Sequence, residues 1–481
     1  MPSFQKHQEG FLYTQVIDYV KSLMSKQYLL AGHKLPSLRK LSAQLDVSVP
    51  TIQQAYEELE RQGFVESRPK SGFYVIDIAQ SFKTVSMPSF TTKPRTVRRQ
   101  SLIEQVYQLA HAPRCYPFGI SSPTRAQPCD KALDRTHRRI TNRKSIQSTS
   151  YAPVNGEASL RQQIAEYYFS HGLVVDPEHI VITNGAQEAI AIALMSVAKA
   201  GDVIAVESPT YFGILELIES LGMMALEIPA CPNTGLCLQD LEVALAAQPV
   251  KAAIICTAIN NPLGSLMTNQ KRKLLVELLE KQKIPLIEDD VYSDLAFTKE
   301  RPTPAQYYSK KGIVMTCSSF SKTTAPGYRT GWVISEKYYG DIHRLKRSLS
   351  CSSSLLHQKT LAEFMATGEF RQNIKRLKNV LITNRDRTLR LLQQHMPLDI
   401  RISEPQGGSV FWIELPKNAH ANALFERLAQ SNIAIAPGTI FSPSGKFNHF
   451  FRMTFGLPWD DIFEENLIQL SEGVKKYLQV L

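Results

Sequence analysis

The sequence predicts an α/β protein of more than one domain, with a small helical unit near the N-terminus and a larger domain that contains a parallel sheet. Three observations support this fold class. The chain has 481 residues, more than one ordinary domain, and its 43% hydrophobic content suffices for large cores. Residues 38–59 show the apolar period of two short helices. Residues 284–289 form an apolar run that ends in a carboxylate, as a parallel strand does where it meets a ligand.

The two helices near the N-terminus form a helix-turn-helix pattern. Apolar residues at 38, 41 and 45 predict the first helix, those at 52, 55, 56 and 59 predict the second, and a tight turn at Asp46-Val47-Ser48 separates them. Ser48 is the expected N-cap of the second helix, and Gly63 is expected to end it. Two short helices can also serve packing alone.

A short hairpin is expected after these helices. Residues 64–75 predict two short strands joined by a basic Pro/Gly turn. With the segment Leu35-Pro36-Ser37-Leu38-Arg39, this arrangement resembles the winged helix-turn-helix of the GntR family. In that family the second helix enters the major groove of DNA and the wing contacts the backbone or the minor groove.

The resemblance to GntR proteins implies a double-stranded DNA operator as a partner. The residues that it implies as DNA contacts are Arg39, Ser48, Thr51 and Gln53 in the helices, and Lys70 and Gly72 in the wing. Many relatives have arginine where this chain has Val49 and Gln53. The base preference therefore stays open, and adenine is one candidate because a glutamine amide can pair with it.

Residues 78–115 are expected to be a basic linker. Residues 76–150 hold 13 Lys and Arg against 4 Asp and Glu, so most of the net charge of +11 lies there. One short helix near Leu102 is the only periodic element expected. The segment either raises affinity for phosphates or is a solvated tether. If extended, it could span on the order of 100 Å, enough for head-to-tail exchange of N-terminal domains across a homodimer.

A lysine in a Ser/Thr-rich segment marks the larger domain. Ser319 precedes Lys322 by three residues, and Arg329 follows it by seven. A lysine amine can form a Schiff base with a carbonyl, while a hydroxyl and a guanidinium can bind a phosphate on the same ligand. Pyridoxal 5′-phosphate carries both groups. Taken alone, a surface lysine in a loop would be the simpler interpretation.

Residues upstream supply other groups that this cofactor needs. Asp289 could keep the pyridine nitrogen protonated, which makes the ring an electron sink. Tyr292 and the amide of Asn261 could both reach the 3-oxygen of the ring. An Asn-Pro pair alone would be an ordinary turn. The order Asn, Asp, Tyr, Lys, Arg within about seventy residues is nevertheless hard to obtain by chance.

On these motifs, the chain resembles the fold-type I aminotransferases over residues 116–481. The resemblance implies a domain that binds pyridoxal 5′-phosphate (PLP), with a mainly parallel central sheet and a small C-terminal α+β subdomain. It also implies a phosphate seat at a helix N-terminus, made by Gly185, Ala186 and Gln187. Without the resemblance, Gly185 would be only a turn.

Three more positions take roles from the same resemblance. Tyr211 matches the aromatic residue that stacks on the pyridine ring, and Arg452 matches the arginine that grips a substrate's α-carboxylate bidentately. Tyr151 matches a tyrosine that reaches the phosphate of the neighbouring subunit, which implies a homodimer. Core packing for Tyr211 and a surface salt bridge for Arg452 are the alternatives. Leu263 stands where the family usually has Thr, so catalytic competence stays open.

The two resemblances together identify the chain as a member of the MocR-type regulators. They imply a DNA-binding domain at 1–77, a linker at 78–115 and an effector-sensing and dimerisation domain at 116–481. The protein would then be a transcription regulator that senses an amine, an amino acid or PLP through Schiff-base exchange. The alternative is an active PLP-dependent aminotransferase with an accessory DNA-binding module. A winged helix has no role in metabolism, which favours the regulator.

Cysteine usage and hydropathy indicate the compartment. The seven cysteines lie scattered without a Cys-x-x-Cys motif, which fits a reducing cytoplasm and argues against a disulfide scaffold or a metal site. The longest apolar stretch, residues 189–198, is too short to cross a bilayer, and no signal-like N-terminus is expected. The sequence thus predicts a cytoplasmic protein without a metal.

Overall fold

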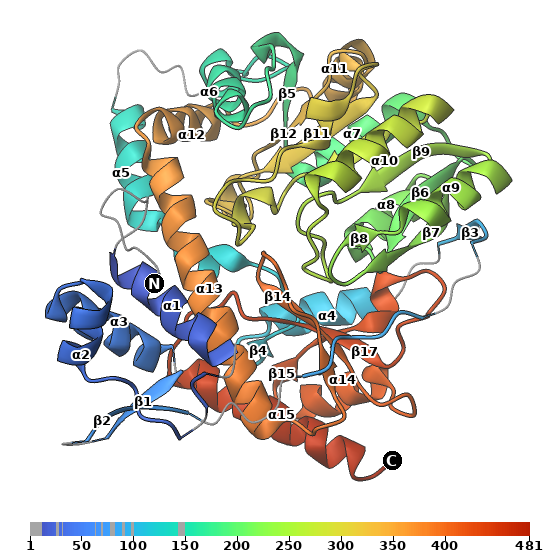
Figure 1. The fold of residues 1–481 in the computed structure, drawn as a ribbon. Helices are drawn as coiled ribbons and strands as arrows, with labels where there is room; N and C mark the ends of the chain where they lie inside the picture. Colours follow the sequence, from blue (N-terminus) through green and yellow to red (C-terminus); the bar gives the residue numbers. More distant parts are fainter. Residues whose placement is uncertain are drawn as a thin grey trace. The chain divides into compact units, whose positions relative to one another are not determined.

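The structure is a computed structural model that describes residues 12–481 apart from 26–27, 31, 63, 69–70, 77–81, 89–91, 98–100 and 143–149. The chain divides into two units, residues 1–82 with 383–396, and residues 83–382 with 397–481 (Figure 1). The helix end expected at Gly63 and the wing residue Lys70 lie outside the described residues.

The first unit contains three helices, α1 (Leu12–Ser25), α2 (Leu38–Leu45) and α3 (Val49–Arg61). Helices α2 and α3 confirm the helix-turn-helix, whereas α1 was not anticipated. The backbone N–H of Lys40 donates to Ser37 Oγ at 3.3 Å and caps α2. Asp46 adopts a left-handed conformation with φ +52°, which ends α2 and makes the turn tight.

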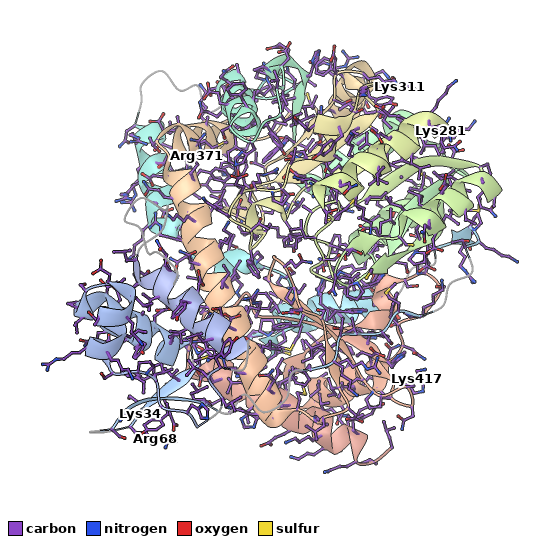
Figure 2. All side chains as sticks on the ribbon, viewed as in Figure 1. Lys34, Arg68, Lys281, Lys311, Arg371 and Lys417 are labelled. Atoms are coloured by element: carbon purple, nitrogen blue, oxygen red, sulfur yellow. The ribbon has the colours of Figure 1, made fainter. Side chains whose placement is uncertain are left out.

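The predicted wing is confirmed as an antiparallel hairpin of β1 (Val65–Arg68) and β2 (Gly72–Val75). Its turn is followed by Gly72 at φ +112°, a conformation that favours glycine. Figure 2 labels Lys34 and Arg68 beside this hairpin. Their cationic groups lie 5.9 and 4.2 Å from the centre of the Tyr74 ring, so aromatic packing holds two positive charges at the wing.

A large mixed sheet forms the centre of the second unit. Its strand order is β3-β7-β6-β9-β10-β11-β12-β5, with β8 paired to β7. The pairs from β7 through β11 are parallel, which confirms the predicted mainly parallel sheet, while β3, β8, β12 and β5 join by antiparallel pairs. The bounds are β3 (Arg95–Thr96), β5 (Ile180–Thr183), β6 (Val203–Ser208), β7 (Met224–Cys231), β8 (Gly235–Leu236), β9 (Val250–Ile255), β10 (Leu286–Asp289), β11 (Val314–Ser319) and β12 (Gly331–Ile334).

Helices cover both faces of this sheet. Along β6, Ile204 and Val206 belong to a core with helices α7, α8 and α11, whereas Val203 and Ala205 belong to a core with α9 and α10. Because both faces are buried, the strands read as continuous apolar runs. The bounds are α7 (Ala186–Val197), α8 (Phe212–Ser220), α9 (Leu238–Ala247), α10 (Asn269–Gln282) and α11 (Tyr339–Leu349).

The expected C-terminal α+β subdomain is also present. Its antiparallel sheet has the order β13-β14-β17-β16, and β15 pairs with β4. Its strands are β4 (Tyr116–Pro117), β13 (Arg401–Ile402), β14 (Val410–Glu414), β15 (Ile433–Ala434), β16 (Ala436–Pro437) and β17 (Phe450–Thr454). The remaining helices are α4 (Ser101–His111), α5 (Asp130–Thr141), α6 (Ala158–Phe169), α12 (Leu355–Ala366), α13 (Glu369–His395), α14 (Ala421–Gln430) and α15 (Asp461–Leu478).

The described part of the linker packs on the second unit. Strand β3 extends the edge of the large sheet beside β7, and α4 follows it in the chain. Nearer the N-terminus, the Ile402 N–H donates to the Lys83 carbonyl at 3.2 Å, and the Ser86 N–H donates to Glu414 at 2.5 Å. These contacts attach the described part of the segment to the second unit at several points.

Within the described ranges, no helix combines the length and apolarity that a membrane span requires. The same residues contain no group of three His, Cys, Asp or Glu side chains that could hold a metal ion.

Candidate functional site

A cavity of about 220 Å³ lies in the second unit, beyond the carboxyl ends of β10 and β11. Most of the residues predicted to form a cofactor site line it. They are Ala186, Gln187, Tyr211, Asn261, Asp289, Tyr292, Ser319, Lys322, Arg329 and Arg452. This edge of a parallel sheet is where α/β proteins bind ligands.

Lys322 lies in the turn that follows β11. Its Nζ donates to the Ser121 carbonyl at 2.5 Å and lies 5.5 Å from the centre of the Tyr292 ring. The hydroxyl of Tyr292 in turn lies 2.6 Å from Ser121 Oγ. The amine is thus held beside an aromatic ring and polar groups inside the cavity, the setting that a carbonyl-binding lysine requires.

Asp289 is the last residue of β10 and faces the same cavity. Burial raises the pKa of its carboxyl to about 6, and the charge of Asp290 acts in the same direction. The Val291 N–H, 3.2 Å from Asp289 Oδ1, and the charge of Lys322 both lower this pKa. A carboxylate at the end of a buried strand is well suited to pair with a protonated ring nitrogen.

A second part of the cavity lining, called the phosphate end below, is suited to a phosphate. Helix α7 begins here, and its first backbone N–H groups have no acceptor within the helix. Gly185 precedes it at φ +86°, and a Cβ at this position would collide with the Arg329 guanidinium. That guanidinium donates to the Asn184 carbonyl at 3.2 Å and to Ser321 Oγ at 3.4 Å. A helix N-terminus, an arginine and serines thus converge.

Tyr211 also lines the cavity and lies directly before α8. A Cβ at Gly213 would lie 2.5 Å from the Tyr211 ring, so the glycine makes room for the aromatic side chain. Gln187 Nε2 donates to the Gly213 carbonyl at 2.6 Å and ties α7 to this turn. The ring of Tyr211 is therefore held in place at the cavity.

Arg452 closes the cavity from strand β17. It is 2% exposed, and it donates to Asn261 Oδ1 at 2.9 Å and to the Gly119 carbonyl at 2.6 Å. Its buried Nε has no hydrogen-bond partner among the described residues, and none of their carboxylates lies within ion-pair distance. Burial lowers the pKa of this guanidinium. A buried cation without an anion is costly, so the geometry suits an anionic ligand.

Two predicted cofactor residues do not line the cavity. Gly185 lies directly behind it, as described above, and shapes the approach of Arg329. Tyr151 is 88% exposed and has no place at this cavity within its own chain.

Five of the predicted DNA contacts fall on described residues. Arg39 is exposed on α2, and Gln53 is exposed on α3, where its Nε2 donates to Glu57 at 2.8 Å. Ser48 occupies the N-cap position of α3, but the expected cap hydrogen bond is absent. Its Oγ lies 2.7 Å from Thr51 Oγ1 instead, because two neighbouring hydroxyls satisfy each other. Gly72 begins β2 in the wing.

Several lining residues were not predicted. They are Val106, Tyr107, Gly119, Ile120, Ser121, Ile190, Phe212, Val291 and Ser321. Ser121 and Lys322 lie 201 positions apart in the chain, and no local pattern marks the first of them. Ser321 could have been found, because it lies within the same serine-rich segment as Lys322.

Residues 113–462 match the family described as aminotransferase class I and II, and residues 12–75 match the bacterial regulatory proteins of the gntR family. The chain belongs to the aminotransferase class I and II family, in a branch that carries a GntR-type helix-turn-helix. Two similar proteins from Escherichia coli strain K12 are the HTH-type transcriptional regulators YjiR and YdcR, each 34% identical to this chain. The alignment with YjiR covers 93% of this chain and 95% of YjiR, and that with YdcR covers 97% and 99%.

Members of this fold among solved structures include LysN, the α-aminoadipate aminotransferase of Thermus thermophilus, and the kynurenine aminotransferase of Pyrococcus horikoshii. The first is 24% identical with a TM-score of 0.73 and covers 80% of this chain and 96% of its own. The second is 23% identical with a TM-score of 0.74, over 79% and 96%. Family membership implies PLP as the cofactor, and the charges and donors of the cavity fit that ligand.

Proposed function

We propose that the protein is a DNA-binding transcription regulator of the MocR type, which binds PLP at Lys322 and senses an amine, an amino acid or PLP itself. The observation that carries the proposal is Arg452, a buried guanidinium at the Lys322 cavity whose Nε lacks a described acceptor. An α-carboxylate would satisfy it. The winged helix-turn-helix and the relatives named as transcriptional regulators support the proposal that the protein acts by binding DNA.

PLP supplies an aldehyde that condenses with amines and a ring that accepts electrons. In the proposal, Lys322 holds the aldehyde, Asp289 faces the ring nitrogen, and Tyr211 packs against the ring. Asn261 and Tyr292 serve the 3-oxygen. The phosphate is held by the α7 N-terminus and nearby side chains, namely Gly185, Ala186, Gln187, Ser319 and Arg329.

Sensing would proceed by Schiff-base exchange. An effector amine that took the place of Lys322 would free its Nζ, and Arg452 would hold the effector's carboxylate. Arg452 lies in the small subdomain and Lys322 in the turn after β11 of the large sheet, so open and closed forms would bind the effector unequally. Only such a difference can shift the operator-bound population, and about 1–3 kcal/mol of coupling suffices.

The proposed active form is a homodimer, in which the linker is long enough for head-to-tail exchange of the N-terminal domains. The exposure of Tyr151 leaves this side chain available to a neighbouring subunit. The proposed division is DNA binding at 1–77, a linker at 78–115, and effector sensing and dimerisation at 116–481. A DNA operator as partner would make the cytoplasm the place of action.

The deciding experiment measures operator affinity and amino-group turnover on one sample. The operator is first selected from random duplexes with the full-length, PLP-loaded protein, and a panel of amines and amino acids is then added. A change in operator affinity without multiple turnover supports the regulator. Rapid multiple turnover with operator affinity unmoved favours an active aminotransferase, for which the set of Lys322, Asp289 and Tyr292 would suffice.

DNA binding itself has a separate test. Arg39→Ala is expected to weaken binding to all sequences, whereas Gln53→Ala should alter sequence preference more than affinity. The log of the affinity should fall linearly with the log of the salt concentration. A salt-independent affinity would exclude phosphate contacts as the main contribution.

A further inference from the structure

One wall of the Lys322 cavity is apolar, and part of it comes from α4, a helix that carries no cofactor motif. Val106 and Tyr107 of α4, with Ile120, Ile190 and Phe212, line the cavity alongside the polar residues already described. Val106 is 2% exposed and Phe212 is 3% exposed, so these side chains are part of the packed wall. They are called the apolar wall below.

Tyr107 contacts both the apolar wall and Tyr211, which is proposed to pack against the PLP ring. Its ring packs edge-on against Phe212 at 5.7 Å, and its hydroxyl lies 3.4 Å from the Tyr211 hydroxyl. Phe212 in turn lies 5.9 Å from the Arg452 guanidinium, measured to the ring centre. A ligand whose carboxylate meets Arg452 therefore has aromatic rings beside it. Tyr107 keeps 41% of its surface exposed and thus has a face free for contact.

Few charged side chains line the cavity, and each one suits a particular group of PLP or of the effector. Among its described lining residues, the cations are Lys322, Arg329 and Arg452, which suit an aldehyde, a phosphate and one carboxylate respectively. The only acid is Asp289, at the end of β10. Among these described lining residues, no charge of either sign is left for the far end of an effector's side chain, and burying an unpaired charge beside them would be unfavourable.

We infer that the effector is an α-amino acid with an uncharged, mainly apolar side chain, and that Val106 and Tyr107 of α4 select it. The inference rests on the proposed function, because it assumes an amino compound at Lys322. It separates this chain's effector from dicarboxylic amino acids, from diamino acids and from ω-amino acids. An ω-amino acid would not place its amine at Lys322 and its carboxylate at Arg452 with a side chain on the apolar wall.

The first test is direct binding to the full-length, PLP-loaded protein. Calorimetry would compare alanine, leucine, phenylalanine, aspartate, lysine and 4-aminobutyrate. Leucine or phenylalanine is expected to bind at least tenfold more tightly than aspartate, lysine and 4-aminobutyrate. Equal or tighter binding of any of these three overturns the inference.

Variants of α4 test the assigned residue. Tyr107→Ala should weaken the binding of leucine and phenylalanine while leaving alanine unchanged. Tyr107→Arg should strengthen aspartate at least tenfold relative to leucine, because it adds a cation to the apolar wall. Gln108→Arg is the matched control, since it adds the same charge to the same helix at an exposed position outside the cavity. Thermal midpoints and bound PLP confirm that each variant folds.

The outcomes are distinguishable. If Tyr107→Arg and Gln108→Arg change the aspartate preference equally, the role of Tyr107 is refuted. If aspartate or 4-aminobutyrate binds best and shifts operator affinity, the inference fails and the proposed function stands. If no amino compound binds, the inference fails, and sensing of PLP itself is the part of the proposed function that still stands.

Discussion

The phosphate end and the apolar wall of the Lys322 cavity are built in different ways. The phosphate end comes from short segments that sequence motifs mark, with Gly185 before α7 and Arg329 seven residues after Lys322. The apolar wall comes from Val106 and Tyr107 of α4, together with Ile120, Ile190 of α7 and Phe212 of α8, and apart from Tyr107 these are ordinary apolar residues. The phosphate end must match a fixed cofactor, so its residue types are constrained. The apolar wall needs only shape and apolarity, so many side chains would serve there without loss of the cofactor.

The largest effect is expected from removing Lys322, the lysine proposed to hold the PLP aldehyde. Lys322→Ala is expected to abolish covalent trapping of PLP by borohydride, because no other lysine lines the cavity among its described residues. Mass spectrometry of the borohydride-treated protein measures the amount of covalently attached PLP. Wild-type levels of trapping in the variant would show that another lysine carries the cofactor.

Arg452→Gln tests the proposed carboxylate site, which lies beside Phe212 of the apolar wall. Loss of a charged hydrogen-bonding partner should weaken phenylalanine binding roughly ten- to hundredfold. Phenylethylamine is the matched ligand, since it keeps the ring and the amine but lacks the carboxylate, and its affinity should stay unchanged. If both ligands lose affinity equally, Arg452 supports the fold of the cavity rather than the carboxylate.

Gly185→Ala tests whether the phosphate end depends on a missing Cβ. The methyl group would displace Arg329, so affinity for PLP should fall by about tenfold while affinity for pyridoxal, which lacks the phosphate, should not. Gly172→Ala is the control, because Gly172 has the same φ of +86° but nothing within 4 Å of the position that an added methyl group would take. It should lower only the unfolding free energy. Equal losses of PLP affinity in both variants would refute the steric argument.

The smallest expected effect concerns pH. The Asp289 carboxyl has its pKa raised to about 6, so it is ionised above that pH and protonated below it. Pairing with a protonated ring nitrogen requires the carboxylate, and PLP binding below pH 6 must therefore release a proton. Affinity should fall as pH drops through about 6, by at most tenfold per pH unit. Asp289→Asn should flatten this step, and an unchanged step would assign it to another group.

Local patterns predicted the parts of the molecule that depend on local physics. Helices α2 and α3 have apolar residues at helical spacing, and the strand before Asp289 is a continuous apolar run, so both were predictable. Ser121 and Tyr107 acquire their places only through tertiary packing, at separations of 201 positions from Lys322 and 104 from Tyr211. Ser48 takes the predicted N-cap position, but its hydroxyl pairs with that of Thr51 instead of accepting a backbone N–H, a choice that residue type alone does not decide.

The anchored linker has a consequence for building chimeric regulators. A junction near residue 115 would discard β3, the Ser86 contact with Glu414 and the α4 side of the cavity, all of which belong with the larger unit. A junction near residue 82 would keep them. A foreign DNA-binding domain joined there should receive an intact receptor, whereas one joined at residue 115 should receive a receptor that still holds PLP but has lost part of its ligand selectivity.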